Sequence, residues 1–450
     1  MATPKISLDT QSSLRHRLAE ARSRTDVLFE LLPPNTFYRR PIPERHRLIF
    51  YLGHLEAFDW NLLGEPIGLE SRNPAFDKLF AFGIDPLDGG LPSDQPGDWP
   101  SIAHVEKYSR IVREHLDDRL ADPRAFASFP PALADGTLLH VAIEHRHMHA
   151  ETLAYLLHNL PPERKMPRPG AAADPTPAPK QRQAKIPEGI ATLGQPAESP
   201  RDFGWDNEFG TQQIFVPEFS IDVFPVTNAA FLRFVQAGGY HEPAYWRSED
   251  WQWMRRQRLE HPHFWLARSS SHPTDPDTQW EYRTMFGTIP LPASWPVYVS
   301  YAEAAAFARW AGKGLPTEAQ WHRAAYGRPY GAERPYPWGE APPDATRGNF
   351  HHARWDACSV GAHPAGSSAF GVHDLLGNGW EWTSSPFAPL PGFEPFAFYP
   401  GYSANFFDGK HFVMKGGSPR TDACMLRRSF RNWFQPHYPY IYATFRCVEE

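Results

Sequence analysis

The chain has 450 residues, which is more than one ordinary domain and predicts two or three. A hydrophobic fraction of 41% excludes a disordered chain, and a formal net charge of −6 with no long basic run argues against sequence-independent binding of nucleic acid. No segment is apolar over the length of a membrane span, and the N-terminus lacks the apolar part of a signal peptide. With only 3 cysteines, the sequence indicates a soluble, cytoplasmic protein without a disulfide scaffold.

Proline and the aromatic residues are unusually frequent. The chain contains 48 prolines, 31 phenylalanines, 17 tyrosines and 16 tryptophans. Proline interrupts helices, so a chain of this composition cannot consist mainly of long helices. We therefore expect many irregular loops that are secured by aromatic rings.

The first 160 residues predict a four-helix bundle. Apolar residues recur at threes and fours in residues 10–32, and similar patterns follow in residues 44–63, 101–120 and 135–160. Val27 is one of the apolar members of the first helix. Four such helices joined by loops are typical of a bundle.

The composition changes twice after the fourth helix. Residues 161–188 are dense in Pro and Ala and predict an extended linker. From residue 189 to residue 450 the chain shows short strand-like runs, such as residues 215–226, many turns, and helical patterns only in residues 228–237, 301–311 and 317–326. We thus expect a bundle at 1–160, a linker at 161–188 and a mixed, loop-rich domain at 189–450.

The fourth helix carries the clearest chemical signal. His145 and His149 are four residues apart and share one helix face, whereas His147 points to nearly the opposite side and Glu151 shares its face. His54 in the second helix can reach the same interior point of a bundle. Three imidazoles suit a borderline transition metal, zinc or iron. The alternative is chance, because the chain has 21 histidines and any of them can be an ordinary core or surface residue.

The motifs resemble two known domain types. The bundle resembles DinB-like proteins with a His…His-x3-His-x-Glu motif, here His54, His145, His149 and Glu151. The remainder resembles the formylglycine-generating-enzyme-like (C-type-lectin-like) fold, so the fold class is α+β with several domains. The markers of that fold are the segments 224–228, 234–240, 295–297, 315–321, 336–339, 374–383, 416–418 and 445–448.

In this order the two domains resemble the iron-dependent sulfoxide synthases of ergothioneine and ovothiol biosynthesis and the related selenoneine synthases. The resemblance implies that His54, His145 and His149 hold Fe(II), and it selects iron over zinc. It further implies that O2 and a thiol or selenol donor react with trimethylhistidine (hercynine) to form a C–S or C–Se bond. A sulfoxide, a selenoxide or its reduced product results.

The resemblance also assigns residues to the substrates. Asn432 and Trp433 correspond to positions that bind the carboxylate and the ammonium group of trimethylhistidine, although core packing is the commoner role of a tryptophan. Phe434 replaces an acidic residue that grips the donor's amine in members using γ-glutamylcysteine, which argues against that donor. Tyr399 or Tyr402 is the candidate proton donor, with a structural role as the alternative. His145 and Trp433 are expected to face a common cavity.

Several alternatives stay open at this point. A 5-histidylcysteine sulfoxide synthase of the ovothiol type usually has a third, methyltransferase domain, which this chain lacks, and the general likeness slightly favours the selenoneine type. A copper-dependent formylglycine-generating oxidase needs two closely placed thiols, but Cys424 and Cys447 are far apart in sequence. The last rival is a metal-binding thiol transferase that does not use O2.

Overall fold

The computed structural model describes residues 7–82, 91–129, 135–196, 203–268, 274–275 and 278–449. The chain divides into two compact units, Met1–Arg168 (the helical unit) and Pro169–Glu450 (the C-terminal unit). No helix in the described part of the chain combines the length and the apolar character needed to span a membrane.

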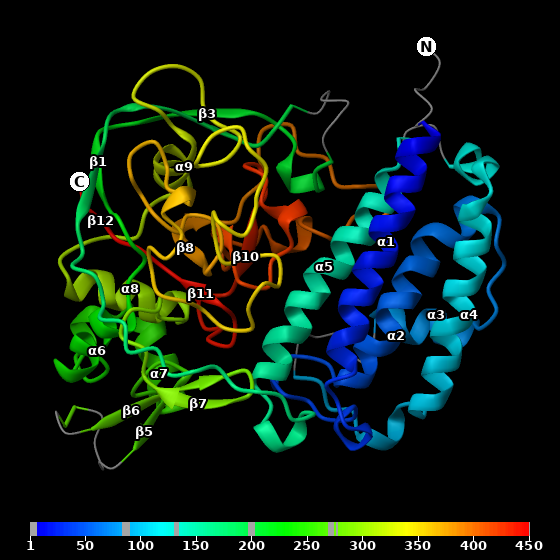
Figure 1. Ribbon diagram of the computed structural model, residues 1–450, viewed down its shortest axis with the longest axis horizontal. Helices are drawn as coiled ribbons and strands as arrows, with labels where there is room; N and C mark the ends of the chain where they lie inside the picture. The colour runs from blue at the N-terminus through cyan, green and yellow to red at the C-terminus, as the bar shows by residue number, and fades with distance from the viewer. Residues whose placement is uncertain are drawn as a thin grey trace. The chain divides into compact units, whose positions relative to one another are not determined.

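The helical unit is a bundle of long helices that lie side by side (Figure 1). Its helices are α1 (Leu8–Phe29), α2 (Leu48–Asp59), α3 (Pro74–Phe82), α4 (Ile102–Ala121) and α5 (Thr137–His158). The four predicted helices are thereby confirmed. The short α3 was not predicted, and α2 starts at Leu48, four residues later than expected, and continues as a π-helical turn over Trp60–Gly64.

Burial follows the apolar pattern of the helices with one exception. In and just after α1, five of the predicted apolar residues are buried: Leu14, Leu18, Ala21, Leu28 and Leu31. Val27 was expected among them, but it is 41% exposed. Residue 27 is next to residue 28 and therefore about 100° away from it around the helix, outside the buried stripe.

The C-terminal unit mixes short helices and strands with long loops. Its helices are α6 (Asn228–Gln236), α7 (Ser248–Gln257), α8 (Tyr301–Trp310) and α9 (Glu318–Tyr326). Three of them were predicted, and α7 was not. The side chains of Asp250, Trp253 and Met254 form the buried stripe of α7, but its other positions are polar apart from Trp251, and they hide the pattern.

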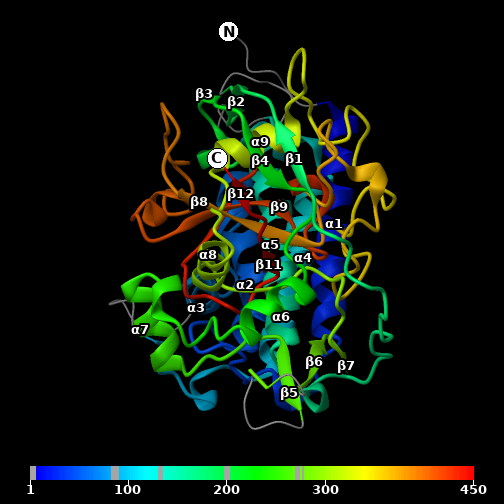
Figure 2. The same ribbon diagram turned by 90° about the vertical axis from the view of Figure 1, so that its left-hand side faces the viewer.

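Twelve short strands are present in the described residues of this unit. They are β1 (Gln183–Ile186), β2 (Gly189–Leu193), β3 (Gln212–Val216), β4 (Phe219–Asp222), β5 (Trp265–Arg268), β6 (Gln279–Thr284), β7 (Gly287–Pro290), β8 (Gly379–Pro386), β9 (Phe412–Gly417), β10 (Asn432–Phe434), β11 (Ala443–Thr444) and β12 (Val448–Glu449). The sheets have the strand orders β10-β9-β8-β11, β1-β4-β12, β5-β6-β7 and β2-β3. Figure 2 shows β8, β9 and β11 of the four-stranded sheet close together.

A buried ion pair ties the four-stranded sheet to the end of the chain. Arg446 donates to Glu381 through Nε (2.7 Å) and Nη2 (2.6 Å), and both side chains are fully buried. Trp321 of α9 donates its indole N–H to the same carboxylate over 2.8 Å. The marker segment around Glu381 therefore connects β8 with α9 and the C-terminal segment.

The proline-rich segment is anchored to the C-terminal unit. Asp174 accepts hydrogen bonds from the indole of Trp295 (2.8 Å) and the hydroxyl of Ser359 (3.0 Å). Farther along, Gln183–Ile186 pairs antiparallel with β4. The last part of the segment that composition marks as a linker thus forms strand β1, because alternate residues of β1 are buried against its neighbours.

Candidate functional site

Three histidines of the helical unit bring their imidazoles together. His54 lies on α2, and His145 and His149 lie one turn apart on α5. One ring nitrogen of each histidine lies within 4.8 Å of the corresponding nitrogen of the other two. His54 and His145 are buried and His149 is half-buried. The grouping matches the set of side chains that spacing and resemblance had singled out.

The hydrogen bond of His54 determines which of its nitrogens can bind a ligand. Nδ1 lies 2.7 Å from the carbonyl oxygen of Phe80, which can only accept, so Nδ1 carries the proton and Nε2 keeps its lone pair. That Nε2 lies 3.2 Å from Nε2 of His149. Two nitrogens 3.2 Å apart that each lie about 2.1 Å from one ion subtend about 100° at it. The separation therefore suits two ligands of the same cation.

Aromatic side chains of α2 hold the imidazole rings in place. Phe58 stacks on His145 with ring centroids 3.4 Å apart and planes 10° apart. Phe50 stacks on His54 at 4.7 Å, and Tyr51 lies 5.7 Å from His149. These contacts restrict the ring orientations, which a metal site requires of its ligands.

The surroundings keep the three imidazoles neutral. Burial lowers the pKa of His54 to about 4. Burial and the neighbouring imidazoles lower the pKa values of His145 and His149 well below their usual range. At neutral pH the rings are uncharged and their lone pairs are available to a cation.

The donor set fits a borderline divalent metal. The grouped atoms are three neutral imidazole nitrogens, a combination that binds Zn(II) or Fe(II). The lone pair of His54 Nε2 faces another ring nitrogen at short distance, and a shared cation satisfies both atoms. The residues present thus form a site that can hold a metal ion.

The predicted substrate residues form β10 in the C-terminal unit. Asn432, Trp433 and Phe434 pair antiparallel with Met414, Val413 and Phe412 of β9, and all three are half-buried. The Oδ1 atom of Asn432 accepts from the backbone N–H of Trp433 over 2.9 Å. Within the described residues no acceptor contacts its Nδ2, so this amide can donate to a ligand.

Trp433 is surrounded by aromatic rings. It stacks on Phe387, and the rings of Tyr402 and Phe406 lie 5.5 Å and 5.6 Å from it. Tyr402 in turn stacks on Trp205 with centroids 4.0 Å apart. We call Phe387, Tyr402, Phe406 and Trp433 the aromatic cluster.

The structure brings both candidate tyrosines near this cluster. Tyr402 belongs to it, and the ring of Tyr399 lies 5.6 Å from the ring of Tyr402. Burial, with a smaller effect of Asp206, raises the pKa of Tyr399. The ring of Phe434 stacks on the ring of Tyr438, with centroids 5.2 Å apart. Trp433 and Tyr402 thus belong to the aromatic cluster, and Phe434 stacks on Tyr438.

Sequence reasoning missed two groups of residues at these sites. Phe387 follows β8 and Phe406 ends a 3-10 helical turn, both far from Trp433 in sequence, and no local pattern connects them. Arg146, between His145 and His147, is buried and ion-paired with Glu56 and Asp59. The two acids in the otherwise apolar stretch of α2 were the one available signal of a buried partner.

The cysteines are not paired. Cys358, Cys424 and Cys447 are all free. Burial raises the pKa of Cys358 to about 12 and raises that of Cys447 as well. Buried thiols of raised pKa are poor nucleophiles and poor metal ligands, so Cys358 and Cys447 are suited to packing, whereas Cys424 is only half-buried.

Comparison with known sequences assigns the helical part and the C-terminal part of the chain each to a known family. Residues 17–153 match the DinB superfamily, and residues 171–450 match the sulfatase-modifying factor enzyme 1-like domain. A DinB bundle with clustered histidines, followed by this domain, defines an oxygenase-type enzyme, as its relatives show.

Three relatives are hercynine oxygenases of mycobacteria. That of Mycolicibacterium smegmatis is 37% identical over 97% of this chain and 99% of its own length, and that of Mycolicibacterium thermoresistibile is 33% identical over 98% and 96%. The match to the Mycobacterium tuberculosis protein is 41% identical but spans only 54% of this chain and 55% of that protein. The chain belongs to the ergothioneine-type family, in which a DinB domain and a sulfatase-modifying-factor domain are joined.

Proposed function

We propose that the chain is a non-haem Fe(II), O2-dependent enzyme that joins an imidazole carbon of hercynine to the chalcogen of a thiol or selenol. The S–H or Se–H bond and the imidazole C–H bond break, and C–S (or C–Se) and S–O (or Se–O) bonds form. O2 takes up four electrons, one oxygen atom entering the product and the other leaving as water. The observation that carries this proposal is the three-imidazole cluster of His54, His145 and His149 in a chain so similar to hercynine oxygenases.

The three histidines would hold the metal. When bound, Fe(II) supplies the redox chemistry that lets O2 react and open positions for other ligands. The contribution of the chain is a set of neutral ligands whose rings are fixed by Phe50, Phe58 and the carbonyl of Phe80. Preorganised ligands lower the cost of assembling the site.

The aromatic cluster and Asn432 would bind hercynine. A trimethylammonium group has no hydrogen to donate and is attracted to the negative faces of aromatic rings, which Trp433 and its neighbours supply. The side-chain amide of Asn432, the residue next to Trp433, would donate a hydrogen bond to the carboxylate of hercynine. The phenol of Tyr402 or Tyr399 would act as the acid and suppress unproductive oxidation of the donor.

The donor would lack a γ-glutamyl amine. Phe434 offers an aromatic ring, stacked on Tyr438, where an ammonium group of γ-glutamylcysteine would need a carboxylate. The family likeness slightly favours a selenol donor and a selenoneine-type product. Sulfur and selenium differ in mass, so mass spectrometry of the product identifies the element.

The proposal is tested by oxygen consumption. Protein loaded anaerobically with Fe(II) is mixed with hercynine and, in separate reactions, cysteine, γ-glutamylcysteine or a selenosugar selenol, and O2 uptake is followed. We expect uptake that needs both hercynine and a donor and that is absent in His145→Ala. Transfer of the thiol to an alkyl halide, with release of halide, by Zn(II)-loaded protein without hercynine and without O2 uptake would instead establish a non-oxidative thiol transferase.

The proposal requires that His145 and Trp433 face a common cavity. A crystal structure with Fe(II) and hercynine should place the substrate imidazole at the metal while the trimethylammonium group contacts Trp433. Binding of hercynine away from either residue would contradict the assignment of the substrate site.

A further inference from the structure

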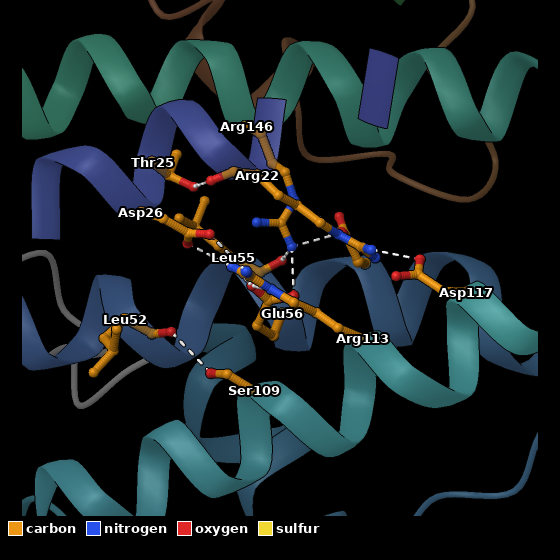
Figure 3. A network of polar contacts seen from close by, with 11 residues as sticks. Arg22, Thr25, Asp26, Leu52, Leu55, Glu56, Ser109, Arg113, Asp117 and Arg146 are labelled. Atoms are coloured by element: carbon orange, nitrogen blue, oxygen red, sulfur yellow. Dashed lines mark hydrogen bonds and ion pairs between the residues drawn. The ribbon is translucent and has the colours of Figure 1, made fainter. Parts of the chain in front are cut away.

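A buried arginine lies between the histidines of α5. Arg146 is fully buried, and its Nη2 donates to Glu56 (2.6 Å) and Asp59 (2.6 Å), while its Nε donates to Asp59 (2.8 Å). Figure 3 shows its guanidinium directed at Glu56 on α2. We call Arg146, Glu56 and Asp59 the α2–α5 clamp.

Arg146 also contacts the backbone next to His54, one of the proposed metal ligands. Nη2 of Arg146 also donates to the carbonyl oxygen of Leu55 over 3.1 Å. Arg146 directly follows His145, and Leu55 directly follows His54. The contact therefore joins equivalent positions on the two helices, each one residue beyond a histidine.

Small slips between the helices are large on the scale of a metal site. Sliding α5 along α2 by one residue moves its side chains by about 1.5 Å, whereas metal–ligand distances are held within about 0.2 Å. Apolar packing alone specifies the position of α5 along α2 only weakly, because apolar side chains of similar size can make equivalent contacts in a shifted position. An ion pair with a backbone hydrogen bond specifies one position.

The clamp is part of a network that reaches the other long helices. Arg113 of α4 donates to Glu56 (2.7 Å) and Asp26 of α1 (2.7 Å). Arg22 of α1 pairs with Asp117 of α4 (2.5 Å) and lies 3.7 Å from Asp59. Each carboxylate of the clamp thus has an arginine of a further helix nearby.

The energetics point to a role other than stability. Removing charges from water is expensive, and apolar residues of similar volume often replace a buried ion pair without loss of stability. The best-attested use of such groups is to fix the register of helices. In the helical unit the register that the clamp fixes is that between His54 on α2 and His145 and His149 on α5.

We propose that Arg146, Glu56 and Asp59 are positioning residues that set the register of α5 on α2 and thereby the spacing of the three imidazoles. The inference rests on the metal-binding part of the proposed function. None of the three residues belongs to the ligand set, and each acts through the helix that carries a ligand.

The experiment compares a clamp variant with a matched control in the full-length protein. Arg146→Met/Glu56→Gln/Asp59→Asn removes the clamp without leaving an unpaired charge in it, since Arg113 keeps Asp26 and Arg22 keeps Asp117. Arg113→Met, the control, removes an arginine of the same network whose hydrogen bonds go to Asp26 on α1 and Glu56 on α2 and not to α5. Each protein is titrated anaerobically with Co(II), whose visible spectrum reports ligand geometry, and its unfolding is measured with guanidinium chloride.

We expect the folded clamp variant to bind Co(II) about 10- to 100-fold more weakly, the range for partners that orient ligands, and with an altered spectrum. Arg113→Met should keep the wild-type affinity and spectrum even if it is less stable. Wild-type affinity and spectrum in the folded clamp variant would overturn the proposal, as would an equal loss in Arg113→Met.

Arg146→Lys covers the case in which the triple variant does not fold. A lysine keeps the charge but lacks the planar fork that reaches Asp59, Glu56 and Leu55 together. We expect weaker Co(II) binding and an altered spectrum here too, and wild-type values would overturn the proposal. Wild-type protein that binds no Co(II) would refute both inferences, whereas Co(II) and Fe(II) binding without O2 uptake would refute the proposed function alone.

Discussion

The indole of Trp433 stacks on the ring of Phe387, with centroids 4.1 Å apart and planes 8° apart. One face of the indole is thereby covered by protein. Trp433 is half-buried rather than fully buried, so part of its side chain remains exposed. The packing role and the binding role that the sequence left open are therefore compatible in this residue.

Trp433→Leu tests the binding role. A desolvated cation–π contact contributes about 1–2 kcal/mol, so we expect the KM for hercynine to rise about 5- to 30-fold. The KM for histidine, which lacks the methyl groups, should change much less. Trp433→Phe, which keeps a ring, should restore most of the preference for hercynine. Equal changes for both substrates would reduce Trp433 to a packing residue.

Alanine substitution of each clustered histidine should remove the metal. We expect metal content, measured by mass spectrometry after reconstitution with Fe(II), to fall to background in His54→Ala, His145→Ala and His149→Ala. His115→Ala is the control, because Nδ1 of His115 is bonded to the carbonyl of Ile111 within α4 (2.7 Å). Full metal content in any of the three ligand variants would remove that residue from the site.

Tyr402→Phe should change the products more than the binding of substrates. The variant keeps the ring that packs between Trp205 and Trp433 but loses the acidic hydroxyl. If Tyr402 is the proton donor, O2 uptake continues while the yield of coupled product falls and oxidised donor accumulates. Tyr399→Phe should keep the wild-type ratio of coupled product to oxidised donor. If Tyr399→Phe lowers this ratio and Tyr402→Phe does not, the proton donor is Tyr399.

Phe434→Asp should admit a different donor. A carboxylate at this position can pair with the amine of a γ-glutamyl group. We expect kcat/KM with γ-glutamylcysteine to rise relative to that with the native donor. Competition between the two donors in one reaction measures the ratio directly. An unchanged ratio would show that residue 434 does not contact the donor.

Glu381→Gln should destabilise the C-terminal unit. The change leaves Arg446 buried without its charge partner, which costs about 3–5 kcal/mol. Guanidinium chloride unfolding followed by tryptophan fluorescence measures this loss. Glu449→Gln is the control, since Glu449 is 50% exposed and pairs with Lys313 at the surface, where ion pairs contribute about 0–1 kcal/mol. Similar losses in the two variants would contradict the structural role of Glu381.

The metal cluster was more predictable from the sequence than the aromatic cluster. His145 and His149 lie one helical turn apart, and this local spacing places them on one face. His54 could be added because the helices of a bundle face a shared interior. Trp433, in contrast, meets Phe387 and Tyr402 through loops, whose paths depend on contacts distant in sequence.

The buried charges explain the remaining gaps. Arg146 in a run of polar residues resembles a surface residue, and only its long-range partners Glu56 and Asp59 account for its burial. The helix α7 was missed for a related reason, because its charged positions obscure a narrow buried stripe. Apolar periodicity identifies helix faces whose buried residues are all apolar. It does not identify helix faces whose buried residues include ion pairs.

Mass spectrometry of the reaction product tests the central claim most directly. Protein reconstituted with Fe(II) is supplied with hercynine, a thiol or selenol donor and 18O2, and the product is fragmented. We expect a single molecule in which the chalcogen is bonded to an imidazole carbon, with 18O in the sulfoxide when the donor is a thiol. Unmodified hercynine beside a disulfide or diselenide of the donor would contradict it.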